Sequence, residues 1–525
     1  MITVAEPAAE QHRTPWVRRE AHWLVPVAVG VVDAAVFAIV APNVNDIFAA
    51  TARASAVLHG VGLDYWFGWF GGGSTPGNYS VLAPYLAALF SAIGLAAIAT
   101  AATAPAAWFA LRGTEHPVAG LWVVVVTAGL NMWSGRVPFA LGCLMAVLTA
   151  GFVMRRRAWL AALFGLLTVA SSPVSAAFLA LILFGLFLSP PEWRRTSVLA
   201  VLPIGIAMVG VAILFGQPGP ESFTLLQLAQ LIAAAAVLLV AATPNWLRTT
   251  IWLTLLGAPV IFLIPNGLGD NLLRLVAYCL PAVVVATSTR PLRTALLAVS
   301  VALALSTKQS VGDVFDAAEP TASPAYYTSL ISELKTLHPQ LRDCRLEVVD
   351  DGTHTASFAL LDHAMLARGY EYQEDNALNA VLAKPDLNAI EYKVWLDNNA
   401  VCFVAIASTY RRAITPEFRL VSRQRPPYLD RVWHDASWTV YRVADPNPIV
   451  AAPVRVVLFS QSRLVLRVPC ACTFGVRVRN PEHLRAVTTP PPGSSAAVVE
   501  ARLAPDGFGW TTMTTTRPGR YTLSG

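Results

Sequence analysis

Long apolar runs alternate with short polar segments along the chain until about Leu305, where the pattern ends. A helix that crosses the hydrocarbon core of a bilayer needs about 20 predominantly apolar residues, so the runs predict about eleven membrane-spanning helices. These predicted spans are His22–Ala41, Leu95–Leu111, Pro117–Leu130, Val137–Met154, Trp159–Ala170, Val174–Leu188, Ser197–Phe215, Leu225–Ala242, Ile251–Ile264, Leu272–Ala286 and Thr294–Leu305.

Two further helices are expected beside these spans. The apolar segment Tyr79–Ile93 begins at a Pro-Gly-Asn-Tyr-Ser sequence and contains Pro84, which favours a re-entrant or interfacial helix over a full span. The segment Ile47–Leu58, directly after the first span, has the pattern of an amphipathic helix.

After Lys308, polar, charged and apolar residues are mixed as in a water-soluble domain. Helices are expected at Tyr326–Leu337 and Ala389–Asn399, with strands at Leu346–Val349 and Val401–Ala407, which together predict an α/β domain over residues 307–445. After the turn-rich Asp445–Pro448, short alternating strands predict a β-sandwich over residues 446–525. Those strands are expected at Val454–Phe459, Ser462–Val468, Thr473–Val478, Ala496–Ala501 and Arg520–Leu523.

Composition and charge agree with a polytopic membrane domain over residues 1–306. The chain is 55% hydrophobic and only 13% charged, which is too apolar for a soluble protein of 525 residues. Arginines occupy every second loop, so the positive-inside rule predicts a cytoplasmic N-terminus and an extracytoplasmic C-terminal region in a multi-pass plasma membrane protein. We attribute most of the net charge of +6 to these loop arginines, which are Arg13, Arg18, Arg19, Arg112, Arg155, Arg156, Arg157, Arg194, Arg195, Arg248, Arg290 and Arg293.

The six cysteines fit this topology. Cys143 and Cys279 lie inside predicted spans, whereas the other four lie in the exported region, where oxidation is permitted. Either a Cys344–Cys402 bridge forms, or these two cross-link to Cys470 and Cys472, because the Cys-Ala-Cys spacing of the last pair disfavours a mutual disulfide.

Asp46 is the most informative candidate residue, because it follows the first span at the expected outer mouth of the membrane domain. A carboxylate there serves either as a general base or as the N-cap of the following amphipathic helix. The next loop supplies Tyr65, Trp66 and Trp69, which either stack on sugar rings or belong to an ordinary interfacial aromatic belt. Three glycines at 71–73 would let this loop close over a ligand.

Two outer loops carry basic residues against the positive-inside bias. Arg136 and Arg274 are suited to pair with phosphate oxygens, and a helix starting at Asn271 would add backbone amide donors. The alternative is that each arginine pairs with a nearby acid, Asp46 or Asp270, and only holds loops together.

Several sequence elements occur together as in a known group of proteins. They are the acid after span one, the Pro76–Leu86 stretch that contains Asn78 and Tyr79, the outer Gly135–Gly142 loop, the Gly269–Leu275 element, and the exported segments Leu366–Gln373, Tyr392–Val401 and Pro427–Trp433. Together they resemble polytopic actinobacterial proteins that carry the membrane domain called 6-pyruvoyl-tetrahydropterin-synthase-related. That domain is similar to the GT-C superfamily of glycosyltransferases, which use polyprenyl-phosphate sugars.

The resemblance implies a GT-C-like fold and an inverting glycosyltransferase of the cell envelope. It places Asp46 at the general-base position, with a polyprenyl-phosphate sugar as donor and an envelope glycan or lipid as acceptor on the outer face. The chain departs from better-known members because Asn131 and Arg136 stand where a second acidic motif is usual. No resident cofactor is expected, and a requirement for a divalent cation stays open.

Two other functions are compatible with the same sequence. An envelope lipid transporter or flippase would make use of Asp33, a carboxylate in the middle of the first span. A non-catalytic envelope assembly protein would act through its exported domains.

Overall fold

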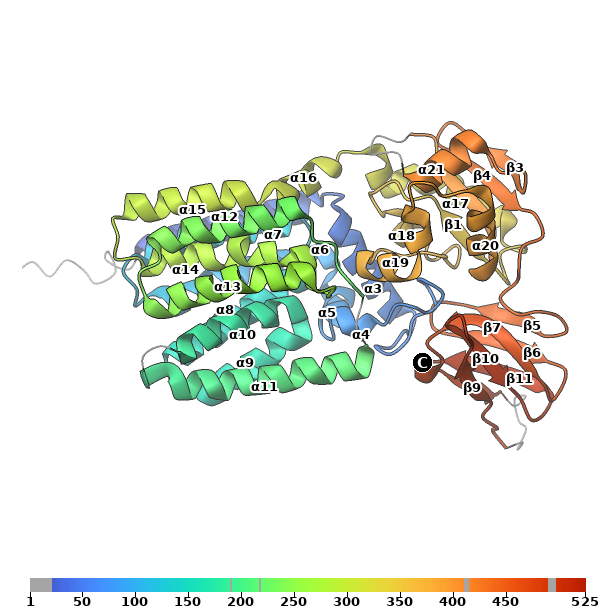
Figure 1. Ribbon diagram of the computed structural model, residues 1–525, viewed down its shortest axis with the longest axis horizontal. Helices are drawn as coiled ribbons and strands as arrows, with labels where there is room; N and C mark the ends of the chain where they lie inside the picture. The colour runs from blue at the N-terminus through green and yellow to red at the C-terminus, as the bar shows by residue number, and fades with distance from the viewer. Residues whose placement is uncertain (1–20, 189–190, 217–218, 410–414, 490–496) are drawn as a thin grey trace, which may run out of the picture.

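The computed structural model describes residues 21–188, 191–216, 219–409, 415–489 and 497–525. Figure 1 shows a bundle of long helices at one end and two smaller domains at the other, with the last of these rich in strands. We call residues 21–316 the helical domain, residues 320–445 the α/β domain and residues 446–525 the β-sandwich.

Every predicted apolar span overlaps a helix of the helical domain. These helices are α2 (Leu24–Val40), α6 (Ala92–Leu111), α7 (Pro117–Trp133), α8 (Val137–Met154), α9 (Ala158–Ser171), α10 (Pro173–Phe187), α11 (Pro191–Phe215), α12 (Leu225–Ala241), α13 (Asn245–Leu263), α14 (Leu280–Thr287) and α15 (Leu292–Ser306). The predicted span Leu272–Ala286 is irregular at its start. A 3-10 turn (Gly269–Leu272) and a π-helical turn (Leu275–Cys279) precede α14 there.

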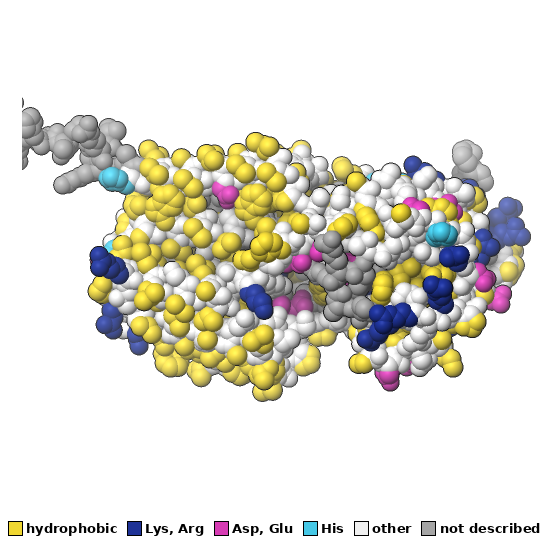
Figure 2. Space-filling model, turned by 90° about the horizontal axis from the view of Figure 1, so that it is seen from above, with side chains coloured by type: hydrophobic (Ala, Val, Ile, Leu, Met, Phe, Trp, Pro, Cys, Tyr) yellow, Lys and Arg dark blue, Asp and Glu magenta, His cyan; other side chains and the backbone are white. Residues whose placement is uncertain are grey.

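Five helices of the described chain are long and apolar enough to cross a membrane, or up to seven if each bent pair counts as one span. The bent pairs are α2 with α3 (Asn45–Leu58), at 73°, and α15 with α16 (Lys308–Asp316), at 52°. The flank of the bundle exposes large apolar side chains such as Ile39, Ile213 and Leu263, and Figure 2 shows this flank mostly covered by hydrophobic atoms. Soluble proteins rarely expose so large an apolar surface, whereas lipid covers it in a membrane.

Short elements cap the end of the helical domain that faces the other two domains. They are α3, α4 (Pro76–Tyr79), α5 (Ala83–Phe90) and α16. The predicted interfacial segment at Tyr79–Ile93 is thus a short helix, α5, followed by the start of α6. Helix α16 packs on α7, so the first ten residues of the expected exported region belong to the helical domain.

The α/β domain contains a four-stranded sheet in the order β1-β2-β4-β3. The strands are β1 (Arg345–Val348), β2 (Val401–Ala407), β3 (Leu429–His434) and β4 (Trp438–Val443). Strands β1 and β2 are parallel and the other pairs are antiparallel. The main helices are α17 (Thr328–Leu337), α18 (Ala356–Ala359), α19 (Tyr372–Leu378), α20 (Ala389–Asn398) and α21 (Pro416–Arg419).

Two antiparallel sheets form the β-sandwich, in the orders β7-β10-β9 and β5-β6-β11-β8. The strands are β5 (Arg455–Phe459), β6 (Leu464–Val468), β7 (Thr473–Arg479), β8 (Arg485–Thr488), β9 (Arg502–Pro505), β10 (Trp510–Thr514) and β11 (Gly519–Ser524). Strands β8, β9 and β10 were not predicted. The strand predicted at Ala496–Ala501 lies partly outside the described residues, and its described part contributes only an isolated bridge from Glu500 to Val487.

The α/β domain and the β-sandwich each contain a disulfide. Cys344 pairs with Cys402, which joins β1 to β2 as one of the two sequence-based alternatives predicted. Cys470 pairs with Cys472, so the prediction that their spacing disfavours a mutual bond was wrong.

Candidate functional site

Asp46 lies in the first turn of α3, where the chain has just left α2 at the bent junction. Val44 occupies the N-cap position, and Asp46 makes no capping bond, so the N-cap alternative for this residue was wrong. Its carboxylate is 20% exposed. Oδ2 of Asp46 lies 3.4 Å from Nε of Arg136, and the hydroxyl of Tyr370, in the α/β domain, donates a hydrogen bond to Oδ1. Asp46 is therefore held between two domains and keeps access to solvent.

Arg136 is buried at the start of α8 and bound by protein groups on all sides. Its Nη2 donates to Asp313 Oδ2 at 2.7 Å, and its Nη1 donates to the hydroxyls of Tyr278 and Ser310 at 2.9 and 2.8 Å. Burial alone would lower its pKa, but Tyr278, Asp313 and Asp46 outweigh that effect and raise it. The structure thus favours the acid-pairing alternative for Arg136 over direct phosphate binding, and this arginine orients the Asp46 carboxylate.

Arg274 keeps its guanidinium available. It is half-buried, lies 5.5 Å above the ring of Phe139, and forms no ion pair with any described residue. A helical segment does begin here and runs over Gly269–Thr287, with Asn271 inside its first, 3-10 turn. The backbone amide of Asn271 donates to the carbonyl of Leu268, so it is not available to an anion. Of the predicted phosphate-binding arginines, Arg274 is the one that no described acid holds in an ion pair, although its charge acts on the nearby carboxylates of Asp270 and Glu221.

Two carboxylates near Arg274 were not recognised from the sequence as a pair. Glu221, in the loop before α12, lies against Gly269, and the backbone amide of Asp270 donates to the carbonyl of Ser222. Burial and the neighbouring Asp270 raise the pKa of Glu221 to about 7, while Arg274 opposes the shift. The loops are far apart in the sequence, so no local pattern announces this contact.

The segment Tyr370–Asp375 of the α/β domain covers the site and contacts residues of the helical domain. Besides Tyr370 on Asp46, Glu371 pairs with Arg53 of α3, and both of these charged side chains are almost fully buried. Glu374 accepts a long hydrogen bond, 3.5 Å, from Nδ2 of Asn78. The sequence resemblance included part of this segment, but only the fold shows that it sits on Asp46.

Arg53 is the centre of the contact between the two domains. Its guanidinium lies 4.1 Å from the ring centre of Tyr79 and 5.1 Å from that of Trp69, while Glu371 neutralises its charge. Tyr79 therefore stacks on a protein cation in this structure, and Asn78 is buried against Glu374.

Tyr65, Trp66 and Trp69 are buried, so they do not form the exposed surface that stacking on sugar rings would require. Trp66 and Trp69 are fully buried in the core of the α/β domain, and Tyr65 is buried in the core of the β-sandwich. Their polar atoms bind protein partners: Trp69 Nε1 donates to the carbonyl of Ser357, and Tyr65 donates to the carbonyl of Arg479. The loop thus anchors the α/β domain and the β-sandwich to the helical domain, and we do not carry its sugar-stacking role forward.

Glycines permit this anchoring at close quarters. A side chain at Gly72, which has a φ of +88°, would collide with the Tyr65 hydroxyl, and one at Gly71 would meet Arg345. The glycines at 71–73 therefore allow tight packing of the loop, and a closing motion is not needed to explain them.

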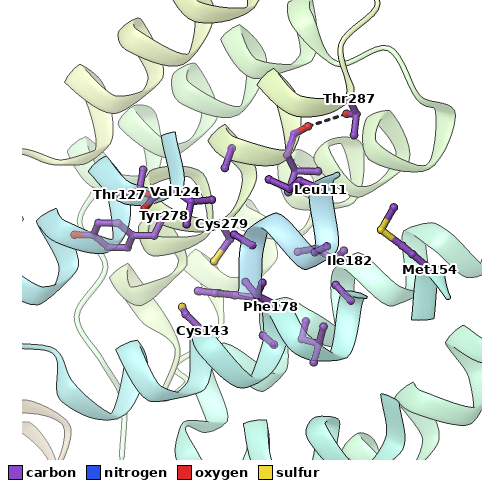
Figure 3. A pocket seen from close by; sticks show the side chains of 18 of the residues that line it. Leu111, Val124, Thr127, Cys143, Met154, Phe178, Ile182, Tyr278, Cys279 and Thr287 are labelled. Atoms are coloured by element: carbon purple, nitrogen blue, oxygen red, sulfur yellow. Dashed lines mark hydrogen bonds between the residues drawn. The ribbon is translucent and has the colours of Figure 1, made fainter. Parts of the chain in front are cut away.

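A cavity of about 900 Å³ runs through the helical domain below the site. Its wall is mostly apolar and comes from α6, α7, α8, α10, α13 and α14; Figure 3 shows Cys143 and Phe178 on one side and Tyr278 and Cys279 on the other. One end of the cavity reaches Phe139, Tyr278 and Asn131, which lie next to Arg274 and Arg136. The other end reaches Glu115, in the loop between α6 and α7, and Asn245, the first residue of α13. The cavity thus spans the depth of the bundle and ends beneath the two arginines.

Metal binding finds no support among the described residues, where no group of three or more His, Cys, Asp or Glu side chains has the geometry to hold an ion. No protein-family model and no curated protein matches the chain. The functional argument therefore depends on the site itself.

The titration of Glu374 gives a testable stability profile. Burial raises its pKa from 4.5 to about 8 against the opposing effect of Arg53. Because the folded pKa lies above the unfolded one, the folded state binds the extra proton between these values. The contribution of Glu374 to stability is therefore fully present below about pH 4.5 and is lost as pH rises through about 8. We expect Glu374→Gln to flatten this decline in a thermal unfolding series from pH 5 to pH 9. The exposed Glu391→Gln serves as control, and an unaltered decline in Glu374→Gln would contradict the assignment.

Proposed function

We propose that this protein is a membrane glycosyltransferase of GT-C-like type, which transfers a sugar from a polyprenyl-phosphate donor to a glycan or lipid at the outer face of the plasma membrane. The observation that carries the proposal is the continuity between cavity and site. Tyr278 lines the cavity and accepts a hydrogen bond from Arg136, which in turn pairs with Asp46. Phe139 lines the same end, directly beneath Arg274.

An amphiphilic donor fits this arrangement. An apolar chain would occupy the cavity between the helices, because burial of apolar surface in a dry, apolar space is favourable. Its phosphate would meet Arg274, whose guanidinium is suited to bind two phosphate oxygens at once. This geometry also fits eleven spans with a cytoplasmic N-terminus, since the basic loops then lie at the end of the bundle opposite Asp46.

The chemistry follows from the charges. A phosphate bound to a sugar is a good leaving group, so the step needs a base for the acceptor hydroxyl and a cation for the departing phosphate. Asp46 accepts the proton as the acceptor oxygen attacks the anomeric carbon, and the bond to phosphate breaks. Arg274 then stabilises the released phosphate. A single displacement of this kind inverts the anomeric configuration.

Transport of an envelope lipid is the second candidate, and the length of the cavity favours it, because a channel reaching both ends of the bundle would suit a lipid that changes leaflet. Asp33 was the residue expected to serve transport. Its Oδ1 accepts a hydrogen bond of 3.0 Å from the indole of Trp133.

Binding of polyprenyl phosphate to the purified full-length protein tests the proposal. Arg274→Gln is expected to weaken binding by roughly tenfold or more, since a hydrogen bond to a charged group contributes about 1.5–3 kcal/mol. Native mass spectrometry with decaprenyl phosphate and decaprenol measures the effect. Arg290→Gln, at the opposite end of the bundle, is the matched control. Equal binding of phosphate and alcohol, or equal loss in both variants, would refute the assignment.

A further inference from the structure

The β-sandwich carries the whole excess of positive charge. Residues 446–525 contain nine arginines and three acids, Glu482, Glu500 and Asp506, so their net charge equals the +6 of the complete chain. The attribution of that charge to the cytoplasmic loops was therefore wrong, because acids elsewhere in the chain balance the loop arginines.

Three of these arginines form a row across one sheet. Arg467 of β6 lies directly opposite Arg455 of β5 on one side and Arg520 of β11 on the other. Residues paired in this way share a face of the sheet, with Cβ atoms about 4.5–5.5 Å apart. All three are exposed. The neighbouring residues Leu466 and Tyr521 point into the sandwich core, so the arginines point outward.

Two more arginines share this outer face. Arg463 directly precedes β6, two residues before Val465 of the same face, and Arg485 of β8 pairs with Ser524 of β11, two residues beyond Thr522. Uncharged Val465 and Thr522 lie between the two basic rows. Of the three acidic residues in the domain, Glu500 is the one whose backbone forms a β-bridge to this sheet, with Val487 of the edge strand β8.

Like charges placed directly opposite each other destabilise a sheet, and ion pairs usually relieve them. Among the described residues, the side chains of Arg455, Arg467 and Arg520 form no ion pair. The fold thus holds three unneutralised guanidinium groups side by side, which is the arrangement that an anion with several charges would stabilise.

We propose that this face, formed by Arg455, Arg467, Arg520, Arg463 and Arg485, binds an extended anionic polysaccharide. The three arginines of the first row span about 10 Å at the usual strand spacing, which suits successive charges along one chain better than a single small anion. In Figure 1, β5, β6 and β11 lie at the end of the molecule away from the helical domain. A soluble polysaccharide could therefore reach this face without contact with the helical domain. This inference does not depend on the proposed transfer reaction.

Binding of polygalacturonate to the full-length protein in neutral detergent tests this inference, with dextran as the uncharged probe. Wild type should bind polygalacturonate with an affinity that falls as salt rises, and should not bind dextran. The triple variant R455Q/R467Q/R520Q should lose roughly tenfold in affinity, because each exposed charge contact contributes about 0.2–1 kcal/mol. The control R342Q/R423Q/R431Q makes the same charge change on the α/β domain and should change affinity less than about twofold.

A second measurement separates binding from folding. Removal of the opposed charges relieves repulsion, so the thermal midpoint of the triple variant should be equal to or above that of wild type. Equal losses in the triple and control variants would overturn the proposal, since only total charge would then matter. It would also be overturned if the triple variant lost binding to phosphatidylglycerol vesicles but kept polygalacturonate binding, because the face would then serve lipid.

Discussion

Asp46→Asn is expected to lower sugar transfer by about a hundredfold to ten-thousandfold, the usual contribution of a positioned general base. The asparagine side chain keeps an oxygen that accepts a hydrogen bond from the Tyr370 hydroxyl, but it cannot act as a base toward an acceptor hydroxyl at neutral pH. The domains should therefore remain docked while the reaction is lost. Release of labelled sugar from polyprenyl-phosphate donors by membranes carrying each variant measures the effect.

Asp313→Asn is the matched control for Asp46→Asn. Asp313 pairs with the same arginine, at 2.7 Å from Nη2 of Arg136, so both variants remove one negative charge from one guanidinium. The proposed mechanism gives Asp313 no proton to transfer, and its loss should reduce transfer only a few-fold, by a small change in the position of Arg136. Equal losses in the two variants would assign Asp46 to structure, and full transfer with normal binding in Asp46→Asn would remove it from the reaction.

Arg53→Leu is expected to cost about 3–5 kcal/mol of stability, since removal of one partner leaves the other charge buried and unpaired. Glu371 is 4% exposed, so it has no solvent to replace the guanidinium. Leucine also loses the contacts with Tyr79 and Trp69. We expect a lower thermal midpoint and faster proteolysis between the helical and α/β domains.

The double variant R53L/E371L separates the ion pair from the packing. With both charges removed, no unpaired charge remains, and much of the lost stability should return. If the double variant is as unstable as the two single variants added together, the Arg53–Glu371 contact is not a coupled pair. The exposed pair Lys384–Glu391 provides the comparison, since Lys384→Leu should leave the thermal midpoint close to that of wild type.

Helices and domain order followed from the sequence because each depends on local pattern. Apolar runs located every long helix, and a short continuous apolar run located the fully buried strand Val401–Ala407 with its observed bounds. Strand β10 was missed because three of its five residues are polar threonines, and the strand forms only when β7 and β9 pair with it on both sides. The start of α14 was missed because the π-helical turn breaks the helical period.

The candidate site was only partly predictable. Asp46 and Arg274 were found because charge is unusual beside an apolar span. Arg53 was missed because one arginine in an amphipathic helix has the appearance of a solvated residue, and its partner Glu371 lies in another domain. The exposure of Tyr65, Trp66 and Trp69 was misjudged for the same reason, since burial by a distant domain leaves no signal in the loop itself.

A structure of the protein with decaprenyl phosphate bound tests the central claim most directly. The account predicts that the prenyl chain enters the cavity between Phe178 and Tyr278, with its phosphate against Arg274 and its terminal oxygen facing Asp46. A chain lying on the outer surface of the bundle, or a phosphate bound at the Glu115 end of the cavity, would contradict it.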